Sequence, residues 1–232
     1  MHPHGSGEGR ATPPRPEAPE HERSDSPIIG APMRQVRGVL FVDYVRMLRA
    51  TKVPTLTQHL SDEELSYLTQ AIDKTAWYPM HIFEKLGCAI LAIVARNEMF
   101  PVRLWGRYSA TQLHKQYPAL LQPNEPVETL NRFRVLRETF FDFPALTVPL
   151  LNDEAAQITI AYHMGNPAEE AASFQTMGFF EGLLELAGCK DIHADFRSRS
   201  WKNEGQTMLS LQWQNPSSPR PSTARTPTKP GK

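Results

Sequence analysis

A histidine and a carboxylate one helical turn apart are the first residues of this sequence that could do chemistry together. His81 and Glu84 have this spacing, and an imidazole beside a carboxylate can bind a metal ion or transfer a proton. No third ligand follows at a matching spacing, so the pair is more typical of a solvated helix face. His163 and His193 fall on the polar faces of predicted strands, where surface histidines are common.

Nucleophilic side chains give no stronger site. Ser61 and Ser109 lack the flanking glycines of a nucleophile elbow, and the chain has no glycine-rich phosphate loop. Cys88 and Cys189 are the only cysteines, and each lies in an apolar helical stretch, which predicts reduced core thiols rather than a disulfide or a zinc site. We therefore expect no enzyme, no catalytic residue, no metal and no cofactor.

Charged residues on one predicted strand allow two interpretations. Arg197 and Arg199 alternate on one strand face with His193 and Asp195. Such a row could bind an anion or a protein partner, but an outward-facing sheet surface has the same pattern and is the commoner explanation.

Aromatic residues suggest a pocket. Trp77, Tyr78, Trp105 and Tyr108 lie in or beside predicted helices, and Phe180 lies in a later apolar helix. Ligand pockets are lined mainly by apolar and aromatic side chains with a few polar groups. The same residues at helical spacing are also typical of an ordinary core, so both interpretations stay open.

The first half of the chain predicts helices. Residues 36–42 form a valine-rich run that predicts a strand, and Asp43 is the expected cap of a helix over 44–51. Ser61 and Glu64 have the spacing of a capping box. Further helices are expected over 61–72, 80–97, 102–117 and from 123 to before Pro144.

The second half predicts two hairpins around a buried helix. Alternating apolar residues predict strands over 146–150 and 158–162, and again over 192–199 and 209–213. Between the hairpins, Asn166 and Pro167 predict the start of a helix that ends at Gly188. The expected fold class is therefore α+β, with an N-terminal helical layer packed on an antiparallel sheet of two β-hairpins separated by a buried helix.

Composition bounds the domain and its surroundings. Residues 1–33 hold seven prolines and residues 215–232 hold five, which predicts two disordered proline-rich tails around a single domain over 34–214. The chain carries 25 acidic and 25 basic residues, so neither nucleic acid nor an anionic membrane is an expected partner. No apolar run is long enough to span a bilayer and the N-terminus lacks a signal-peptide pattern, so we expect a cytoplasmic protein.

The element order resembles a known superfamily. Tyr162 and the sequence Gly-Phe-Phe-Glu-Gly-Leu-Leu-Glu over 178–185 carry the likeness across residues 75–214. The superfamily contains haem nitric-oxide/oxygen-binding domains, 4-vinyl-reductase-type small-molecule-binding domains and small subunits of the TRAPP tethering complex. Residues 77–79, 106–107 and 178–188 together are similar to a paralogous family described from myxobacteria, a resemblance that implies no activity.

The haem-binding branch of this superfamily holds the haem propionates with a Tyr-x-Ser-x-Arg motif. Here the tyrosine is present as Tyr162, but Met164 and Asn166 replace the serine and the arginine. Two carboxylates would then lack their cation. His114 is the one histidine in a plausible helix for an iron ligand, and its neighbours are polar. The sequence therefore predicts no haem.

The resemblance and the aromatic residues together predict a non-enzymatic sensory or regulatory module that binds a small apolar ligand between its helices and its sheet. The expected ligand-binding residues are Trp77, Tyr78, Trp105, Tyr108, Tyr162 and Phe180. An alternative from another class is a protein-interaction or scaffold domain, acting as a homodimer or with another protein through its surface and its tails.

Overall fold

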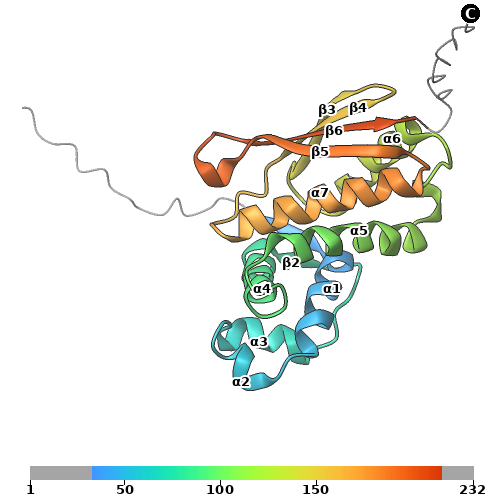
Figure 1. Cartoon of the computed structure of the whole chain (residues 1–232). Helices are drawn as coiled ribbons and strands as arrows, with labels where there is room; N and C mark the ends of the chain where they lie inside the picture. Colours follow the sequence, from blue (N-terminus) through green and yellow to red (C-terminus); the bar gives the residue numbers. More distant parts are fainter. Residues whose placement is uncertain (1–32, 216–232) are drawn as a thin grey trace, which may run out of the picture. The chain divides into compact units, whose positions relative to one another are not determined.

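The computed structural model describes residues 33–215, so the predicted tails lie almost wholly outside the described residues. The N-terminal part is helical, apart from two short strands, and the C-terminal part holds a sheet and one long helix (Figure 1). The elements in chain order are β1 (Gln35–Arg37), α1 (Gly38–Arg49), α2 (Val53–Leu56), α3 (Asp62–Thr69), β2 (Trp77–Pro79), α4 (Met80–Ile93), α5 (Met99–Gln116), α6 (Pro126–Leu136), β3 (Leu146–Leu151), β4 (Ala155–Ile160), α7 (Ala168–Leu186), β5 (Lys190–Ser198) and β6 (Thr207–Gln214).

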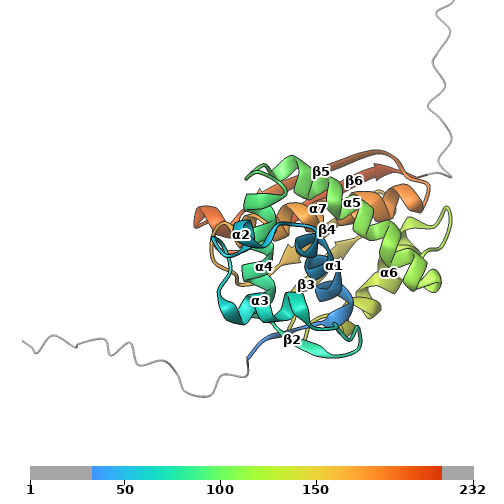
Figure 2. The ribbon, with the colours of Figure 1, turned by 90° about the horizontal axis from the view of Figure 1, so that it is seen from below.

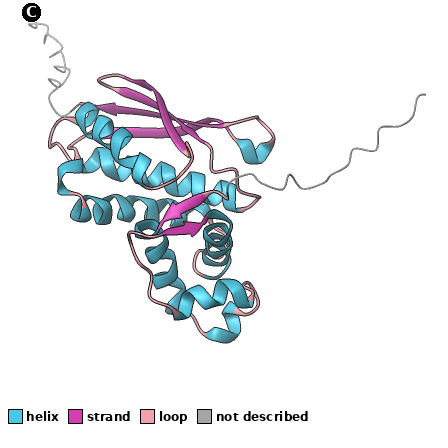
Figure 3. Ribbon diagram, turned by 180° about the vertical axis from the view of Figure 1, so that it is seen from behind, coloured by secondary structure: helices cyan, strands magenta, loops and turns pink. Residues whose placement is uncertain are grey.

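The main sheet is antiparallel and has the strand order β3-β4-β6-β5. Each predicted hairpin forms, and the second strand of each one, β4 and β6, pairs with the other at the centre. Ile158, Ile160, Leu209 and Leu211 alternate with more exposed residues and are fully buried, so one face of the sheet belongs to the core. The α+β class and the two hairpins are confirmed (Figure 3).

Helix α7 is the buried helix that the sequence predicts. It lies between the sheet and α5, as two perpendicular views show (Figures 1 and 2). Phe180, Leu183 and Leu184 have no exposed surface. The helix ends where Gly188 takes a positive φ of 92°, a conformation that glycine adopts at little cost.

Helices α5 and α7 pack unusually closely through glycines. A Cβ atom added at Gly178 would overlap the carbonyl oxygen of Arg103, and one added at Gly106 would overlap the carbonyl oxygen of Gln175. At Gly182 a Cβ would lie 2.8 Å from the carbonyl oxygen of Arg107, which is also too close. Gly178 and Gly182 thus permit the close approach of α5.

Two arginine–glutamate pairs run alongside this glycine contact. The Arg103 guanidinium donates to both carboxylate oxygens of Glu181, with 2.9 Å between Nε and Oε2, and Glu181 is almost fully buried. One turn further along, Arg107 pairs with Glu185. The Glu181 carboxylate raises the pKa of Arg103 above its usual value, because it stabilises the charged guanidinium.

Helix α7 begins near Asn166 and Pro167 as predicted, but neither residue caps it with a side-chain hydrogen bond. Asn166 is exposed and its side chain makes no capping hydrogen bond, and Pro167 stands at the N-cap position rather than at the first helical residue. The carboxylate of Glu169 accepts the backbone N–H of Met164 at 2.8 Å instead. A carboxylate in the first turn of the helix therefore accepts a hydrogen bond from the backbone that leads into it. The positive end of the helix dipole favours an acid at this place.

The predicted strand over 36–42 is largely wrong. Only β1 is extended, because Val36 pairs with Tyr78 of β2, and α1 begins at Gly38. Phe41, Val45 and Leu48 then follow at helical spacing and are fully buried, so burial of this stripe outweighs the strand preference of the valines. Asp43 is consequently not a cap but lies in the middle of α1.

The other helices follow their predictions with shifted ends. The capping box of α3 is confirmed, since the Glu64 carboxylate accepts the Ser61 backbone N–H at 2.6 Å. Helix α4 ends before residue 97, because Arg96 and Asn97 take positive φ angles. Among residues 33–215, no helix combines the length and the apolar character needed to cross a bilayer.

The close packing of α5 on α7 predicts a strong effect of one methyl group. We expect Gly178→Ala to lower the free energy of unfolding by roughly 1–3 kcal/mol, the usual cost of overpacking, because the backbone of Arg103 cannot move aside alone. Gly87→Ala is the matched control, since its nearest neighbour is the edge of the Tyr44 ring at 3.3 Å. Chemical denaturation measures both variants, and equal stability of the two would contradict the predicted close contact.

Candidate functional site

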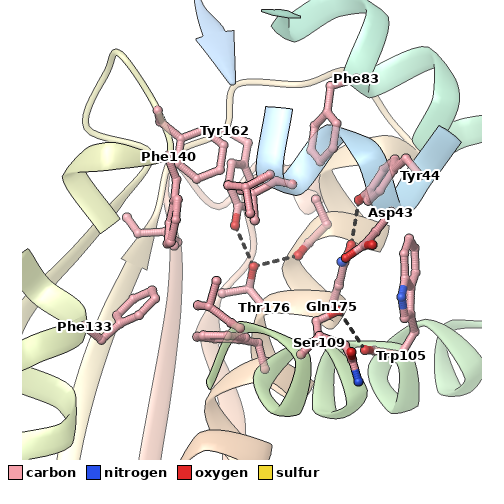
Figure 4. Close-up of a pocket in the computed structure, with 18 of the residues that line it drawn as sticks. Asp43, Tyr44, Phe83, Trp105, Ser109, Phe133, Phe140, Tyr162, Gln175 and Thr176 are labelled. Atoms are coloured by element: carbon pink, nitrogen blue, oxygen red, sulfur yellow. Dashed lines mark hydrogen bonds between the residues drawn. The ribbon is translucent and has the colours of Figure 1, made fainter. Parts of the chain in front are cut away.

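A cavity of about 120 Å³ lies where α1, α4, α5, α6 and α7 meet the segment that leads into β3 (Figure 4). Eight of its 20 lining residues are aromatic. The eight aromatic residues of the lining are Tyr44, Phe83, Trp105, Phe133, Phe140, Phe141, Tyr162 and Phe179.

Helical spacing explains which side chains reach the cavity. On α5, Trp105, Ser109, Gln112 and Gln116 follow at steps of three or four residues and so share one face of the helix. An adjacent face of α5, about a quarter turn away, carries Gly106, which packs on α7. The close helix contact therefore fixes the angle at which α5 presents its cavity face.

The two tyrosine hydroxyls of the lining are bound to α7. Tyr44 donates to Oε1 of Gln175 at 2.6 Å, and the Tyr162 hydroxyl lies 2.7 Å from Oγ1 of Thr176. Thr176 donates its own proton to the carbonyl oxygen of Ala172 at 2.8 Å, so Tyr162 is the donor in its pair. Burial raises the pKa of both tyrosines far above the usual value, so both are neutral phenols.

Asp43 is the single charged side chain of the cavity lining within the described part of the chain. Its Oδ1 accepts a hydrogen bond from Nη1 of Arg46 at 3.1 Å. Burial raises the pKa of the Asp43 carboxyl, while the positive charges of Arg46 and Lys74 act against that rise. Sequence reasoning predicted Asp43 as a helix cap and missed its place in the lining.

The structure brings two of the six predicted ligand-binding residues to this cavity, Trp105 and Tyr162. Phe180 is fully buried and points elsewhere, whereas its neighbour Phe179 lines the cavity, because successive helical side chains point about 100° apart. Tyr108 is 59% exposed on the outer face of α5.

Trp77 and Tyr78 also lie away from the cavity. The Trp77 ring lies under the Arg37 guanidinium, 4.1 Å from its centroid. Tyr78 stacks on Phe41 with ring centroids 4.5 Å apart, and its hydroxyl accepts the backbone N–H of Asp73. The expectation that these two residues share one pocket with Trp105 and Tyr108 is therefore wrong, because β2 pairs with β1 and holds both rings there.

The remaining candidates for chemistry do not combine. Glu84 accepts the backbone N–H of Gly165 at 2.8 Å, whereas His81 faces Glu63 at 3.8 Å, so the two point to different partners. Burial raises the pKa of the Cys189 thiol to about 12, which keeps it protonated. In residues 33–215, no group of three or more His, Cys, Asp or Glu side chains could hold a metal ion.

Comparison with known proteins shows a shared fold with solved structures, but no match to a protein family or to a curated protein. No protein-family model matches the sequence, and no curated protein is significantly similar to it. An H-NOX protein of S. oneidensis, solved in the Fe(II)NO ligation state, superposes with a TM-score of 0.51 at 13% identity, over 77% of this chain and 99% of that one. The unliganded Fe(II) H-NOX protein of K. algicida gives a TM-score of 0.54 at 10% identity, over 77% and 96% of the two chains. The resemblance to haem nitric-oxide-binding domains is thus confirmed for the fold.

The residues of this cavity do not fit the haem that the fold implies. Its lining within residues 33–215 includes no histidine or cysteine, its tyrosines are neutral and hydrogen-bonded, and its single charge is the acid Asp43. His114 has a buried Nδ1 without a partner among the described residues, but it is not part of the lining. The cavity is also smaller than the roughly 300–1,000 Å³ typical of pockets for drug-sized ligands.

A cation does lie beside the segment where the haem-binding motif would place one. The Arg34 guanidinium donates to the backbone carbonyl oxygens of Tyr162 and His163, the latter at 2.9 Å, and lies over the Phe143 ring. Through these contacts, Arg34 holds the backbone of the segment that follows β4. Arg34 is not part of the cavity lining, so it does not replace the missing arginine of the motif.

This lining predicts that added haem stays unbound. When the purified protein is mixed with haemin, we expect the absorbance to follow that of free haemin, because the lining supplies neither a histidine nor a cysteine for the iron and no cation for the propionates. Absorbance titration followed by gel filtration measures this. A stoichiometric Soret band that elutes with the protein would contradict the prediction.

Proposed function

We propose that this chain is a non-enzymatic sensory or regulatory module that binds a small, mainly apolar ligand in the aromatic cavity. The observation that carries the proposal is a partly open pocket of about 120 Å³ whose wall holds eight aromatic side chains. An engineered apolar cavity of roughly 150 Å³ binds benzene, so a space of this size suits a single aromatic ring or a molecule of similar volume.

A ligand in this cavity would contact elements from both halves of the chain. Tyr44 comes from α1, Phe83 from α4, Trp105 from α5 and Phe179 from α7. A ligand that fills the space therefore adds contacts between the N-terminal helices and the α5–α7 pair. Binding to one arrangement of these helices stabilises that arrangement, which is how a small molecule can regulate a protein.

The lining supports binding rather than catalysis. Ser109 donates its hydroxyl to the carbonyl oxygen of Trp105 at 3.0 Å, and no histidine or lysine of the described chain stands beside it in the lining to activate it. Tyr44 and Tyr162 are too weakly acidic to exchange protons at neutral pH. We further propose a cytoplasmic protein whose partners are neither membranes nor nucleic acid, in keeping with its balanced charge.

The likeness to H-NOX structures supports a ligand-binding role at the level of the fold alone. One of those structures is described with NO on Fe(II), and the lining found here does not fit an iron porphyrin. We propose that this chain uses the same layout for a different, smaller ligand. The likeness to the myxobacterial paralogous family stays a prediction, since no family model or curated relative supports it.

Filling the cavity tests the proposal. Ala172 lines the cavity from α7, and Ala172→Leu should occupy part of the space and weaken binding of benzyl alcohol at least tenfold. The control is Ala71→Leu, which adds the same side chain at an exposed site outside the lining. Quenching of Trp105 fluorescence and amide NMR shifts measure binding. If benzyl alcohol, toluene and benzylamine all leave the lining residues of the wild-type protein unshifted, the proposal is wrong.

A second candidate function, a homodimeric interaction domain, is favoured by one surface feature. Phe100, Leu104 and Tyr108 follow at intervals of four residues on α5 and are 68%, 47% and 59% exposed. Such an apolar stripe on a helix is typical of a protein-protein contact.

Light scattering tests this second candidate. If the stripe is an interface, the wild-type protein should have twice the mass of one chain, and Leu104→Lys should be a monomer, because a buried lysine without a partner opposes association. Val53→Lys changes an exposed apolar residue elsewhere and should leave the mass unchanged. A wild-type protein that stays monomeric at high concentration contradicts this function.

A further inference from the structure

Asp43 places a negative charge in the cavity lining, and a purely apolar ligand would make no use of that charge. Its carboxylate lies in the lining, near Gln175 and Ser109 in the close-up view (Figure 4). Oδ1 is engaged by Arg46, and within residues 33–215 no hydrogen bond reaches Oδ2. One acceptor oxygen of a partly buried carboxylate is therefore free to bind a further donor.

The contact with Arg46 is one that a ligand can displace or share. The Arg46 side chain is 71% exposed, and exposed pairs three residues apart contribute little because water and salt screen them. Neither Arg46 nor Lys74 belongs to the lining, so both cations act on Asp43 from outside the cavity. Burial of the carboxyl still raises its pKa despite these two charges, which indicates that they compensate its desolvation incompletely.

The rest of the cavity also favours a positive charge over a negative one. Trp105 and Tyr44, whose ring centroids lie 5.0 Å apart, line the same cavity as Asp43, and aromatic rings attract cations. Gln112 and Gln116 make no side-chain hydrogen bond with a described residue, and their amides can accept from an ammonium group or donate to an anion, so the preference for a cation comes from Asp43 and the aromatic rings. A carboxylate ligand would find no cation in the described lining.

We propose that the cavity takes a small aromatic molecule that carries a protonated amine, with the ring among the aromatic side chains and the ammonium group on Asp43. This inference rests on the proposed function and names the chemical class of its ligand. It assigns Asp43 as the residue that distinguishes an amine from a neutral compound of the same shape.

Three probes of matched size test the assignment on the full-length protein. Benzylamine is a cation at neutral pH, benzyl alcohol is a neutral donor of the same shape, and benzoate is an anion. We expect benzylamine to bind about tenfold more tightly than benzyl alcohol, a ratio that corresponds to about 1.4 kcal/mol, and benzoate to bind least. Calorimetry and amide NMR titration measure the three affinities.

Two variants and one control assign the preference to Asp43. Asp43→Asn should weaken benzylamine about tenfold and leave benzyl alcohol nearly unchanged, because the amide keeps the shape and loses the charge. Arg46→Ala should strengthen benzylamine, because it removes the competing cation. Asp153→Asn, in the exposed turn between β3 and β4, removes one negative charge far from the lining and should change neither affinity.

The outcomes separate this inference from the proposed function. Equal binding of benzylamine and benzyl alcohol by the wild-type protein, or an amine preference that survives Asp43→Asn, would overturn the assignment of Asp43 while the cavity remains a ligand site. Failure of all three probes and of toluene to bind would overturn the proposed function itself.

Discussion

The close approach of α5 to α7 is the contact on which the rest of the structure depends. Gly106, Gly178 and Gly182 remove the side chains that would keep the two backbones apart, and Arg103 binds Glu181 beside them. Glycine in a helix interior lowers helix stability by about 1 kcal/mol relative to alanine. The packing that the glycines permit must therefore stabilise the fold by more than that amount. The two helices are thereby held together, with α7 against the sheet and α5 packed on the other side of α7.

The position of α5 on α7 determines what the cavity can be. The face of α5 that carries Trp105 and Ser109 lies about a quarter turn from the glycine contact and is turned toward α1 and α4. Gln175 belongs to both arrangements, because its backbone carbonyl meets Gly106 while its side chain accepts the Tyr44 hydroxyl. A shift of α5 along α7 would therefore change the helix contact and the cavity wall at the same time.

Much of the fold could be predicted from the sequence because its signals are local. The capping box at Ser61, the alternation over β4 and the glycine that ends α7 each depend on a few neighbouring residues. Residues 36–42 show where such signals fail, since valines favour a strand locally while burial of Phe41 against distant side chains makes a helix. The start of α7 likewise depends on Glu169, whose partner Met164 precedes the helix.

The cavity could be predicted only in part, because it is assembled from segments that are far apart in the chain. Trp105 and Tyr162 were expected in the lining, but Phe83, Phe133, Phe140 and Asp43 were not. Helical phase was the usable signal: Phe179, rather than Phe180, lies four residues after Gln175 and three after Thr176, and all three face the cavity. No comparable signal marks Phe140, which reaches the cavity from an irregular segment after α6.

The contacts that hold the fold together are different from the side chains that line the cavity. This difference explains how a fold seen in H-NOX proteins can have a cavity that does not fit haem. The layout depends on backbone contacts such as Gly178 against Arg103, which do not involve the cavity side chains. The lining can therefore change without loss of the fold, and here phenylalanine rings and neutral, hydrogen-bonded tyrosines take much of the space between α1 and α7. What remains is a small aromatic space with one acid at its wall. On the proposed function, its size disfavours a large prosthetic group and its acid disfavours an anion.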